Sequence, residues 1–233
     1  MTGRAALPTG AAKVAAVRAM FDRIAPRYDL LNRLMTFGMD VRWRRRAVAA
    51  LDLPAQSLVL DVACGTGDLC RDLAGAGHLP IGLDFSAGML AAARTGAPLV
   101  QADALALPVA GQAADGITCG FALRNVESLP RLFTELARVL RPGGRLSILE
   151  VAEPDARLLR AGHHLYFRRL VPLIGGLLSD RDAYGYLPRS TAYLPRRESL
   201  VAMVMAAGFD AVRVHPLALG AAQLITATRA GAR

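Results

Sequence analysis

Hydrophobic and polar positions follow two different periods along the chain, and the change between them falls near Ser57. Over residues 14–51 apolar residues recur every three or four positions with basic residues between them, which is typical of helices. Pro26 and Gly38 interrupt this pattern, so we predict about three short helices in this region. After Ser57 short apolar runs alternate with helical patterns, which indicates a mixed α/β fold.

Seven apolar runs have the length and composition of strands. They cover residues 58–63, 80–84, 97–101, 114–120, 145–151, 211–215 and 222–228. Helical patterns cover residues 68–76, 86–95 (with Ser86 as N-cap), 130–140 and 197–207, and the turn 141–144 ends the third of these helices. Because strands that alternate with helices form parallel sheets with helices on both faces, we predict a Rossmann-like, seven-stranded, mostly parallel sheet.

Residues 156–178 break this alternation with a long, partly apolar helical segment where one short crossover would suffice. We interpret this segment as part of a helical cap insertion. The predicted organisation is a single domain, 1–233, and its parts are N-terminal helices over 14–51, a binding core over 57–152, the cap over 156–195, and a closing helix and strands over 196–230.

A Gly-rich turn follows the first predicted strand, over residues 59–68 (Val-Leu-Asp-Val-Ala-Cys-Gly-Thr-Gly-Asp). Gly65 and Gly67 let the backbone approach a ligand closely, because they carry no Cβ. A dinucleotide fingerprint needs a third glycine where this chain has Cys70, which argues against a nicotinamide-dependent reductase. Asp61 and Asp68 beside the turn suit a ligand with a cationic amino-acid end, and S-adenosylmethionine has one.

Acidic residues also follow the second and third predicted strands. Asp84 closes the second strand, where this fold places an acid that accepts the ribose hydroxyls. Asp103 follows the third strand, where it can accept a hydrogen bond from an adenine amino group. A single aspartate in a turn is often only a local cap, but the three positions together predict S-adenosyl-L-methionine as cofactor. The predicted cofactor residues are Tyr28, Asp61, Ala63, Gly65, Thr66, Gly67, Asp84, Met89, Asp103, Ala104 and Gly120.

Four further signatures carry a family resemblance. They are residues 21–32 (Phe-Asp-Arg-Ile-Ala-Pro-Arg-Tyr-Asp-Leu-Leu-Asn), 121–126 (Phe-Ala-Leu-Arg-Asn-Val), 138–150 (Arg-Val-Leu-Arg-Pro-Gly-Gly-Arg-Leu-Ser-Ile-Leu-Glu) and 180–187 (Asp-Arg-Asp-Ala-Tyr-Gly-Tyr-Leu). In this order they resemble the C-methyltransferases of ubiquinone and menaquinone biosynthesis. The chain departs from the usual family residues at Asp40 (His in the family), Ala152 (Ser) and Gly120 (a small hydroxyl residue), and Asp40 and Ala152 bear on the substrate rather than on the reaction.

The resemblance implies a class I methyltransferase that methylates a ring carbon of a demethylated polyprenyl quinol, with demethylmenaquinol as the main expectation. A ring carbon becomes nucleophilic when the adjacent hydroxyl loses its proton, and a nearby arginine lowers the pKa of an acid by about 1–3 units. We therefore choose Arg124 to stabilise the quinolate, with Asn125 and Tyr28 as further candidate catalytic residues. The alternatives are an ion pair at the sheet edge for Arg124, a helix cap for Asn125 and packing for Tyr28. The reaction requires no metal.

The predicted cap supplies the candidate substrate residues Tyr184, Tyr186 and His164, with cap packing and a surface histidine as the alternatives. Residues 166–170 (Tyr-Phe-Arg-Arg-Leu) mix apolar and basic side chains, as an interfacial helix does. A helix with its apolar side in the core and its basic side in water is the alternative. We expect a lipid-tailed quinol substrate and weak peripheral contact with a membrane.

The chain carries 28 Lys and Arg residues against 19 Asp and Glu, for a net charge of +9. Lys13 is the only lysine, and a GC-rich genome explains this bias as well as an anionic partner does. Aromatic residues make up 6% of the chain, and the fourth predicted strand lacks the Asn/Asp-Pro-Pro-aromatic turn of base methyltransferases, so we expect no nucleic-acid partner.

The three cysteines are scattered, which indicates a reducing compartment, and no apolar stretch approaches the roughly 20 residues of a membrane span. We expect a cytoplasmic protein with peripheral contact to the inner face of the cell membrane. Another small-molecule methyltransferase of natural-product type and a non-catalytic binding protein stay open as alternatives. The oligomeric state also stays open, a homodimer included.

Overall fold

The computed structural model describes residues 10–154 and 190–231. Residues 156–189 of the predicted cap over 156–195 lie outside the described residues, and so do the candidate substrate residues Tyr184, Tyr186 and His164. Their predicted roles therefore stay predictions.

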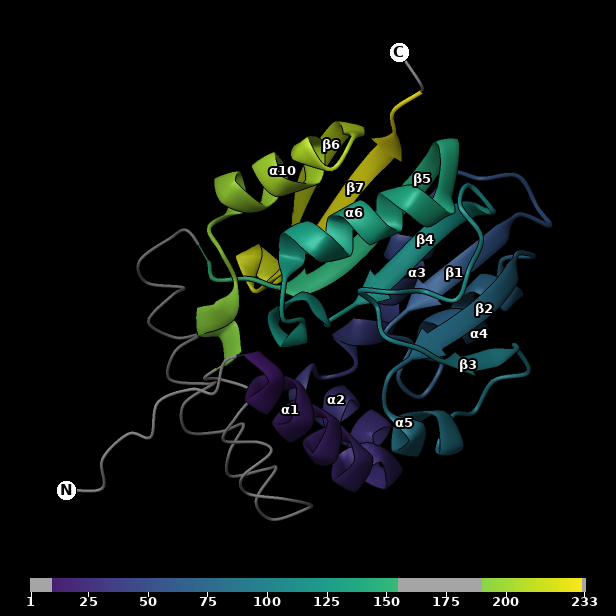
Figure 1. Cartoon of the computed structure of the whole chain (residues 1–233). Coiled ribbons are helices and arrows are strands. Elements are labelled where there is room, and N and C mark those ends of the chain that lie inside the picture. Colours follow the sequence, from purple (N-terminus) through teal and green to yellow (C-terminus); the bar gives the residue numbers. More distant parts are fainter. Residues whose placement is uncertain (1–9, 155–189, 232–233) are drawn as a thin grey trace.

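A seven-stranded sheet forms the centre of the molecule (Figure 1). Its strands are β1 (Leu58–Val62), β2 (Leu79–Asp84), β3 (Leu99–Gln101), β4 (Ala114–Gly120), β5 (Leu140–Val151), β6 (Phe209–Leu217) and β7 (Ala222–Arg229). They lie in the order β3-β2-β1-β4-β5-β7-β6, in which the first five run parallel and β7 is antiparallel to both its neighbours. The predicted seven-stranded, mostly parallel sheet is confirmed.

The strand order places a switch point between β1 and β4. The chain leaves β1 towards β2 and β3 on one side, and it later returns to form β4 on the other side. In open parallel sheets ligands bind outside the carboxyl ends of the strands at such a point. The fold therefore directs attention to the turns that follow β1, β2 and β4.

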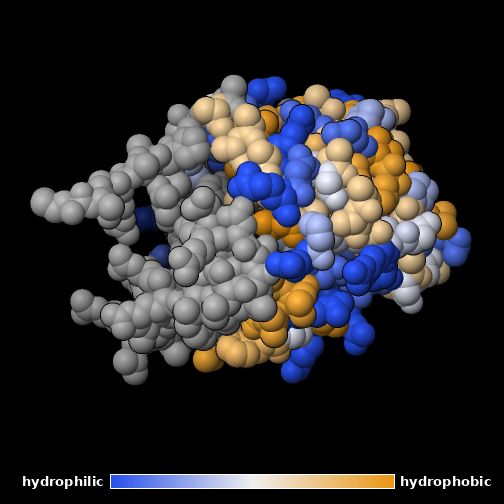
Figure 2. Space-filling model, turned by 90° about the horizontal axis from the view of Figure 1, so that it is seen from below, coloured by the Kyte–Doolittle hydropathy of each residue, from blue (hydrophilic) through white to orange (hydrophobic). Residues whose placement is uncertain are grey.

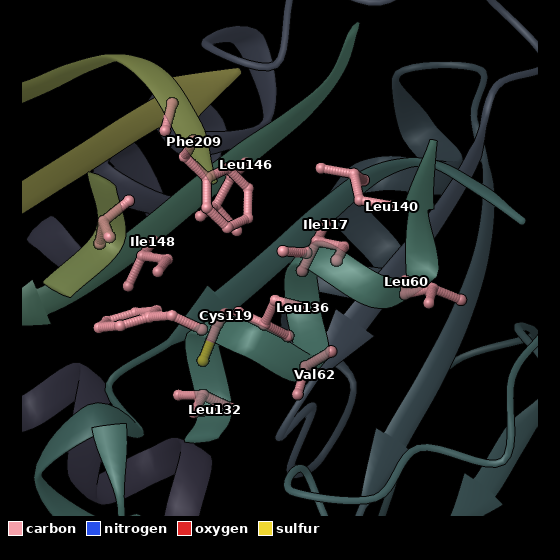
Figure 3. Packing of buried hydrophobic residues seen from close by; sticks show 14 of the residues in the cluster. Leu60, Val62, Ile117, Cys119, Leu132, Leu136, Leu140, Leu146, Ile148 and Phe209 are labelled. Carbon is pink, nitrogen blue, oxygen red and sulfur yellow. The ribbon is translucent and has the colours of Figure 1, made fainter. Parts of the chain in front are cut away.

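Helices cover both faces of the sheet (Figure 1). α6 (Leu129–Val139) and α10 (Arg197–Ala206) lie on one face, whereas α3 (Met39–Ala49) and α4 (Asp68–Gly75) lie on the other. On the first face Leu132 and Leu136 of α6 pack against Ile117, Cys119 and Ile148 of the central strands (Figure 3). This buried cluster is the main hydrophobic core.

The N-terminal region forms α1 (Gly10–Ile24), α2 (Tyr28–Met35) and α3, as the three-helix prediction expects. Pro26 lies in the short 3-10 helix between α1 and α2, and Gly38 precedes α3 with a φ of 73°. α1 and α2 lie near α5 (Ala87–Ala91), beyond the carboxyl ends of the strands (Figure 1). Met20 of α1, Leu31 of α2 and Met89 of α5 share a second hydrophobic cluster.

Three of the differences between predicted and observed boundaries have a clear physical reason. The helix predicted over 86–95 keeps Ser86 as its N-cap but ends at Ala91, because the chain then turns back and Arg94 N donates to Thr66 O. β6 extends to Leu217 through Pro216, which an edge strand tolerates.

β5 begins at Leu140 rather than after residues 141–144. Its partners on β4 show why: Ala114 pairs with Leu140 and Gly116 with Arg145, so the four predicted turn residues bulge out between two paired positions.

Candidate active site

A first cavity opens at the carboxyl ends of β1, β2 and β4, where the strand order predicts a ligand site. Eight predicted cofactor residues line it: Tyr28, Ala63, Gly65, Asp84, Met89, Asp103, Ala104 and Gly120. Arg18 and Phe21 of α1 complete its wall, and Asn125, a predicted catalytic residue, also lines this cavity. The structure thus brings most of the predicted cofactor residues together, although they come from six separate parts of the chain.

Asp84 is the buried acid of this cavity. Its Oδ2 accepts a hydrogen bond from Gly65 N at 2.8 Å, and its Oδ1 accepts one from Ser86 N at 2.8 Å. Burial raises the pKa of Asp84, while these backbone N–H donors favour its charged form. Each carboxylate oxygen has a further lone pair, so Asp84 can also accept the hydroxyls of a ribose.

Asp103 differs from Asp84 because it is exposed. Its Oδ1 accepts from Leu105 N at 2.9 Å, which is the local cap that a turn aspartate commonly makes. It also lines the first cavity, so the two interpretations of this residue are compatible.

Gly67 and Asp61 shape the turn from outside the cavities. Gly67 precedes α4 with a φ of 79°, and a Cβ there would lie 2.7 Å from the Thr95 side chain. The fully buried Asp61 accepts from Thr118 Oγ1 at 2.9 Å and from Cys70 Sγ at 3.4 Å, and burial raises its pKa to about 7. Neither residue lines either cavity, and Cys70, which replaces a dinucleotide-type glycine, contacts this buried acid instead.

Side chains of α1 and α2 connect the N-terminal helices to the turns that follow β1 and β2. Asp22 Oδ1 accepts from Ser86 Oγ at 2.5 Å and from Gly88 N at 2.9 Å, and Asp29 accepts from Thr66 Oγ1. A Cβ on Gly88 would lie 2.8 Å from Asp22 Cα, so only glycine permits this approach. Through these contacts α1 and α2 cover the first cavity, and we call the two helices its roof. The sequence alone did not reveal this arrangement.

A second cavity lies between α2, α3 and the turn after β4. Its own lining includes Asn32, Met35, Phe37, Asp40, Trp43, Arg44, Thr66 and Arg124. It shares five residues with the first cavity: Tyr28, Ala63, Gly65, Gly120 and Phe121. Ala63 and Phe121 hold the left-handed φ values of 57° and 56°, which are uncommon for residues with a Cβ and are often found at functional sites. The two cavities therefore meet at a border of strained backbone.

Arg124 reaches the second cavity from the 3-10 helix Leu123–Asn125. It is buried, and its Nη1 donates to Glu150 Oε1 and to Phe121 O. Glu150 is fully buried, and its Oε2 has no hydrogen-bond partner in the part of the chain that the structure describes. The ion-pair interpretation of Arg124 is thus observed, and the residue faces the cavity as well. Sequence reasoning missed Glu150 as its partner.

Tyr28 stands at the border between the two cavities. Burial raises the pKa of its hydroxyl, although a hydrogen bond with Asn32 and the charge of Arg124 act in the opposite direction. The hydroxyl therefore stays protonated near neutral pH and is able to donate a hydrogen bond into the site.

Arg44 holds three carboxylates beside the second cavity. Its Nη1 pairs with Asp40, its Nη2 with Asp68 at 3.0 Å and its Nε with Asp72 at 3.3 Å. Asp68 also pairs with Arg71, so it serves this network rather than standing alone beside the Gly-rich turn. The signals of this network in the sequence were the i, i+4 spacing of Asp40 and Arg44 and the i, i+3 spacing of Asp68 and Arg71.

Comparison with known proteins agrees with this arrangement. The pattern of the ubiE/COQ5 methyltransferase family matches residues 9–229. The chain belongs to the ubiE/COQ5 methyltransferase family. It is 45% identical to a protein of Thermus thermophilus named demethylmenaquinone methyltransferase, over 88% of this chain and 97% of that one. It is also 42% identical to a Syntrophotalea carbinolica protein named ubiquinone/menaquinone biosynthesis C-methyltransferase UbiE, over 91% and 93% of the two chains.

Solved structures share the fold at lower identity. A SAM-dependent methyltransferase of Thermotoga maritima superimposes with a TM-score of 0.66 at 19% identity, over 91% of this chain and 99% of that chain. The CurJ carbon methyltransferase gives a TM-score of 0.61 at 19% identity, over 94% and 68%. The predicted class I methyltransferase fold is confirmed, and S-adenosylmethionine is the cofactor of this ubiE/COQ5 family member. Among the helices that the structure describes, none has the length and apolar character needed to cross a membrane.

Proposed function

We propose that this ubiE/COQ5 family member methylates a ring carbon of demethylmenaquinol to give menaquinol. The observation that carries the proposal is the border of five residues at which the two cavities meet. A methyl donor in one cavity and an acceptor ring in the other would face each other there. The name of the Thermus thermophilus relative supports demethylmenaquinol as the acceptor.

The first cavity has the residues that S-adenosylmethionine needs. Asp84 offers carboxylate oxygens to the ribose, and Asp103 with Ala104 lies where the adenine would bind. The cofactor, when bound, supplies an activated methyl group on a sulfonium centre. The chain's contribution is to hold the two reactants in line and to exclude water, which is largely an orientation effect.

Arg124 would promote loss of the quinol hydroxyl proton. A guanidinium beside the hydroxyl stabilises the quinolate, and the negative charge spreads onto the ring carbon that forms the new carbon–carbon bond. The bond between this carbon and the methyl group would form as the sulfur–methyl bond breaks and S-adenosylhomocysteine leaves. The carbon would then lose its hydrogen as a proton to water, which restores the aromatic ring, and the oxygen would take up a proton to give the quinol. Glu150 positions Arg124 from behind through its Oε1, and Tyr28 is able to donate a hydrogen bond to a quinol oxygen at the border.

The lipid tail of such a substrate gives the protein a reason to contact a membrane. We propose that the chain acts at the inner face of the cell membrane as a peripheral protein. Tyr184, Tyr186 and His164 stay predicted substrate contacts.

The decisive experiment is methyl transfer from labelled S-adenosylmethionine to chemically reduced demethylmenaquinol, with a short-tail demethoxy-benzoquinol in parallel. Label in the naphthoquinol product alone supports the proposal. Label only in the benzoquinol product assigns the ubiquinone branch instead. Binding of the cofactor without label in either quinol would favour another small-molecule methyltransferase.

A further inference from the structure

Exposed hydrophobic side chains gather at one place in the described part of the chain. Its exposed large hydrophobic residues are Leu30, Leu34, Phe37, Met39, Leu79, Val100, Met205 and Leu219. The first four lie within ten residues of each other, whereas the others belong to β2, β3, α10 and the turn before β7. Single exposed apolar residues are normal on a protein surface, but a group of them marks a contact surface. We call the first four the apolar patch.

The apolar patch includes the exposed part of the hydrophobic stripe of α2. Leu31 is fully buried, yet Leu30 is 55% exposed and Leu34, one turn later, is 41% exposed. At 3.6 residues per turn these three leucines lie side by side on one apolar stripe, with Asp29, Asn32 and Arg33 on the opposite side of the helix. The described part of the chain therefore buries only one edge of this stripe.

Phe37 extends the patch beyond the end of α2. Its N donates to Leu34 O at 3.3 Å, so it follows the helix directly, and its side chain is 72% exposed. Its φ of 51° is unfavourable for a bulky residue. The turn therefore places a largely exposed aromatic ring beside the end of α2, with a backbone conformation that has a cost.

The charged residues around the patch have one sign at the surface. Between residues 27 and 46 the exposed charged residues are Arg27, Arg33, Arg42, Arg45 and Arg46. The two acidic residues of this stretch point inward, because Asp29 bonds to Thr66 and Asp40 to Arg44. Figure 2 views the molecule from the side of α1 and α2, where hydrophobic and hydrophilic surfaces lie next to each other.

We propose that the apolar patch docks on the surface of an anionic lipid bilayer. Hydrophobic side chains that enter the headgroup region, with arginines around them that pair with anionic headgroups, are the recognised combination for interfacial binding. Phe37 and Met39 also line the second cavity, so the patch continues into it. A lipid-tailed substrate would then pass from the bilayer to the cavity without crossing water, a consequence that rests on the proposed function.

A second copy of the chain fits the patch less well than a bilayer. A two-fold interface would bring the same patch of both copies together, and it would therefore place the arginines of one copy near those of the other. Like charges at such an interface repel each other, whereas anionic headgroups attract them.

The test uses the full chain without cofactor or quinol, in co-sedimentation with vesicles of phosphatidylcholine alone or with one quarter phosphatidylglycerol. We expect binding to the anionic vesicles that is at least about tenfold tighter than to the neutral ones. The double variant Leu30→Ser/Leu34→Ser should weaken that binding by about tenfold or more. Neither leucine lines a cavity, and Leu79→Ser/Met205→Ser, which changes two equally exposed residues elsewhere, should bind like the unchanged chain.

Activity separates this proposal from the proposed function. The Leu30→Ser/Leu34→Ser variant should methylate a water-soluble short-tail quinol at the normal rate and lose activity towards a long-tail quinol in vesicles. Unchanged vesicle binding by this variant would overturn the proposal, and so would a dimer that the variant dissociates while no vesicles bind. If vesicle binding is lost in the variant but the unchanged chain methylates no quinol, the docking surface stands and the proposed function fails.

Discussion

The two cavities are built in different ways. In the first cavity strand ends and turns carry the acids, and backbone N–H groups of Gly65 and Ser86 hold Asp84. In the second cavity side chains hold each other: Arg124 pairs with Glu150, and Arg44 pairs with three aspartates. The position of an acid that backbone N–H groups hold is set by the fold. A cavity whose side chains hold each other changes when a few of these side chains are substituted. Substitutions should therefore alter the second cavity more readily than the first.

The largest expected effect comes from Arg124→Gln, in the region held by side chains. Loss of one donor that stabilises a developing oxyanion lowers kcat by about 10²–10³-fold. The affinity for S-adenosylmethionine should stay within threefold, because Arg124 lines the second cavity and not the first. Steady-state kinetics and calorimetric titration measure the two quantities.

Breaking a buried ion pair also destabilises a protein, by about 3–5 kcal/mol. The double variant Arg124→Gln/Glu150→Gln leaves no unpaired charge, so it should recover most of this stability without recovering activity. A kcat within tenfold of normal for Arg124→Gln would contradict the assigned role.

The next largest effect is expected in the first cavity, where backbone N–H groups hold Asp84. Asp84→Ala removes the acceptor of two backbone N–H groups and the proposed ribose contact, so the Kd for S-adenosylhomocysteine should rise by about 100-fold. Isothermal titration calorimetry checks this value, with Asp210→Ala on the exposed part of β6 as control. An unchanged Kd would mean that the first cavity does not bind the ribose.

Arg44→Met tests how far the second cavity depends on its ion network. The variant leaves Asp40 buried without its cation, so the free energy of unfolding should fall by about 3–5 kcal/mol. Urea unfolding measures the change, and Arg42→Met, an exposed neighbour on α3, should change it by less than about 0.5 kcal/mol. Equal effects of the two substitutions would rule out a structural role for the network.

The smallest expected effect concerns Asp61, an acid that accepts hydrogen bonds from side chains beside the Gly-rich turn. The pKa of Asp61 is about 7 in the folded chain and about 3.9 in the unfolded chain. Between these two pH values the folded state therefore binds more protons than the unfolded state. The free energy of unfolding therefore falls as the pH rises from about 4 to about 7. Asp61→Asn removes this contribution, so between pH 5 and pH 8 the variant should gain about 2–3 kcal/mol relative to the unchanged chain. Urea unfolding at both pH values tests this, and a difference that does not change with pH would contradict it.

The sequence predicted the sheet and most of the first cavity because both depend on local pattern. Apolar runs predicted the strands, and Asp84 and Asp103 follow two of these strands, so their position at the first cavity was predictable from the same pattern. The second cavity was less accessible to this reasoning. Arg124 and Glu150 are 26 residues apart, and Arg44 and Asp72 are 28 residues apart, so only packing reveals them as partners. Asp61 shows where the local pattern was not enough. It lies on β1 where a cofactor acid was predicted, but its side chain is buried and lines neither cavity.

The contacts of Asp22 and Asp29 have a consequence for the order of events during turnover. These residues join the roof of the first cavity to Ser86, Gly88 and Thr66, and α2 of the same roof also carries residues that line the second cavity. A movement of α1 and α2 away from these turns would open both cavities together. We therefore expect cofactor and acceptor to exchange together rather than independently, and bound S-adenosylhomocysteine to protect residues 10–35 from proteolysis.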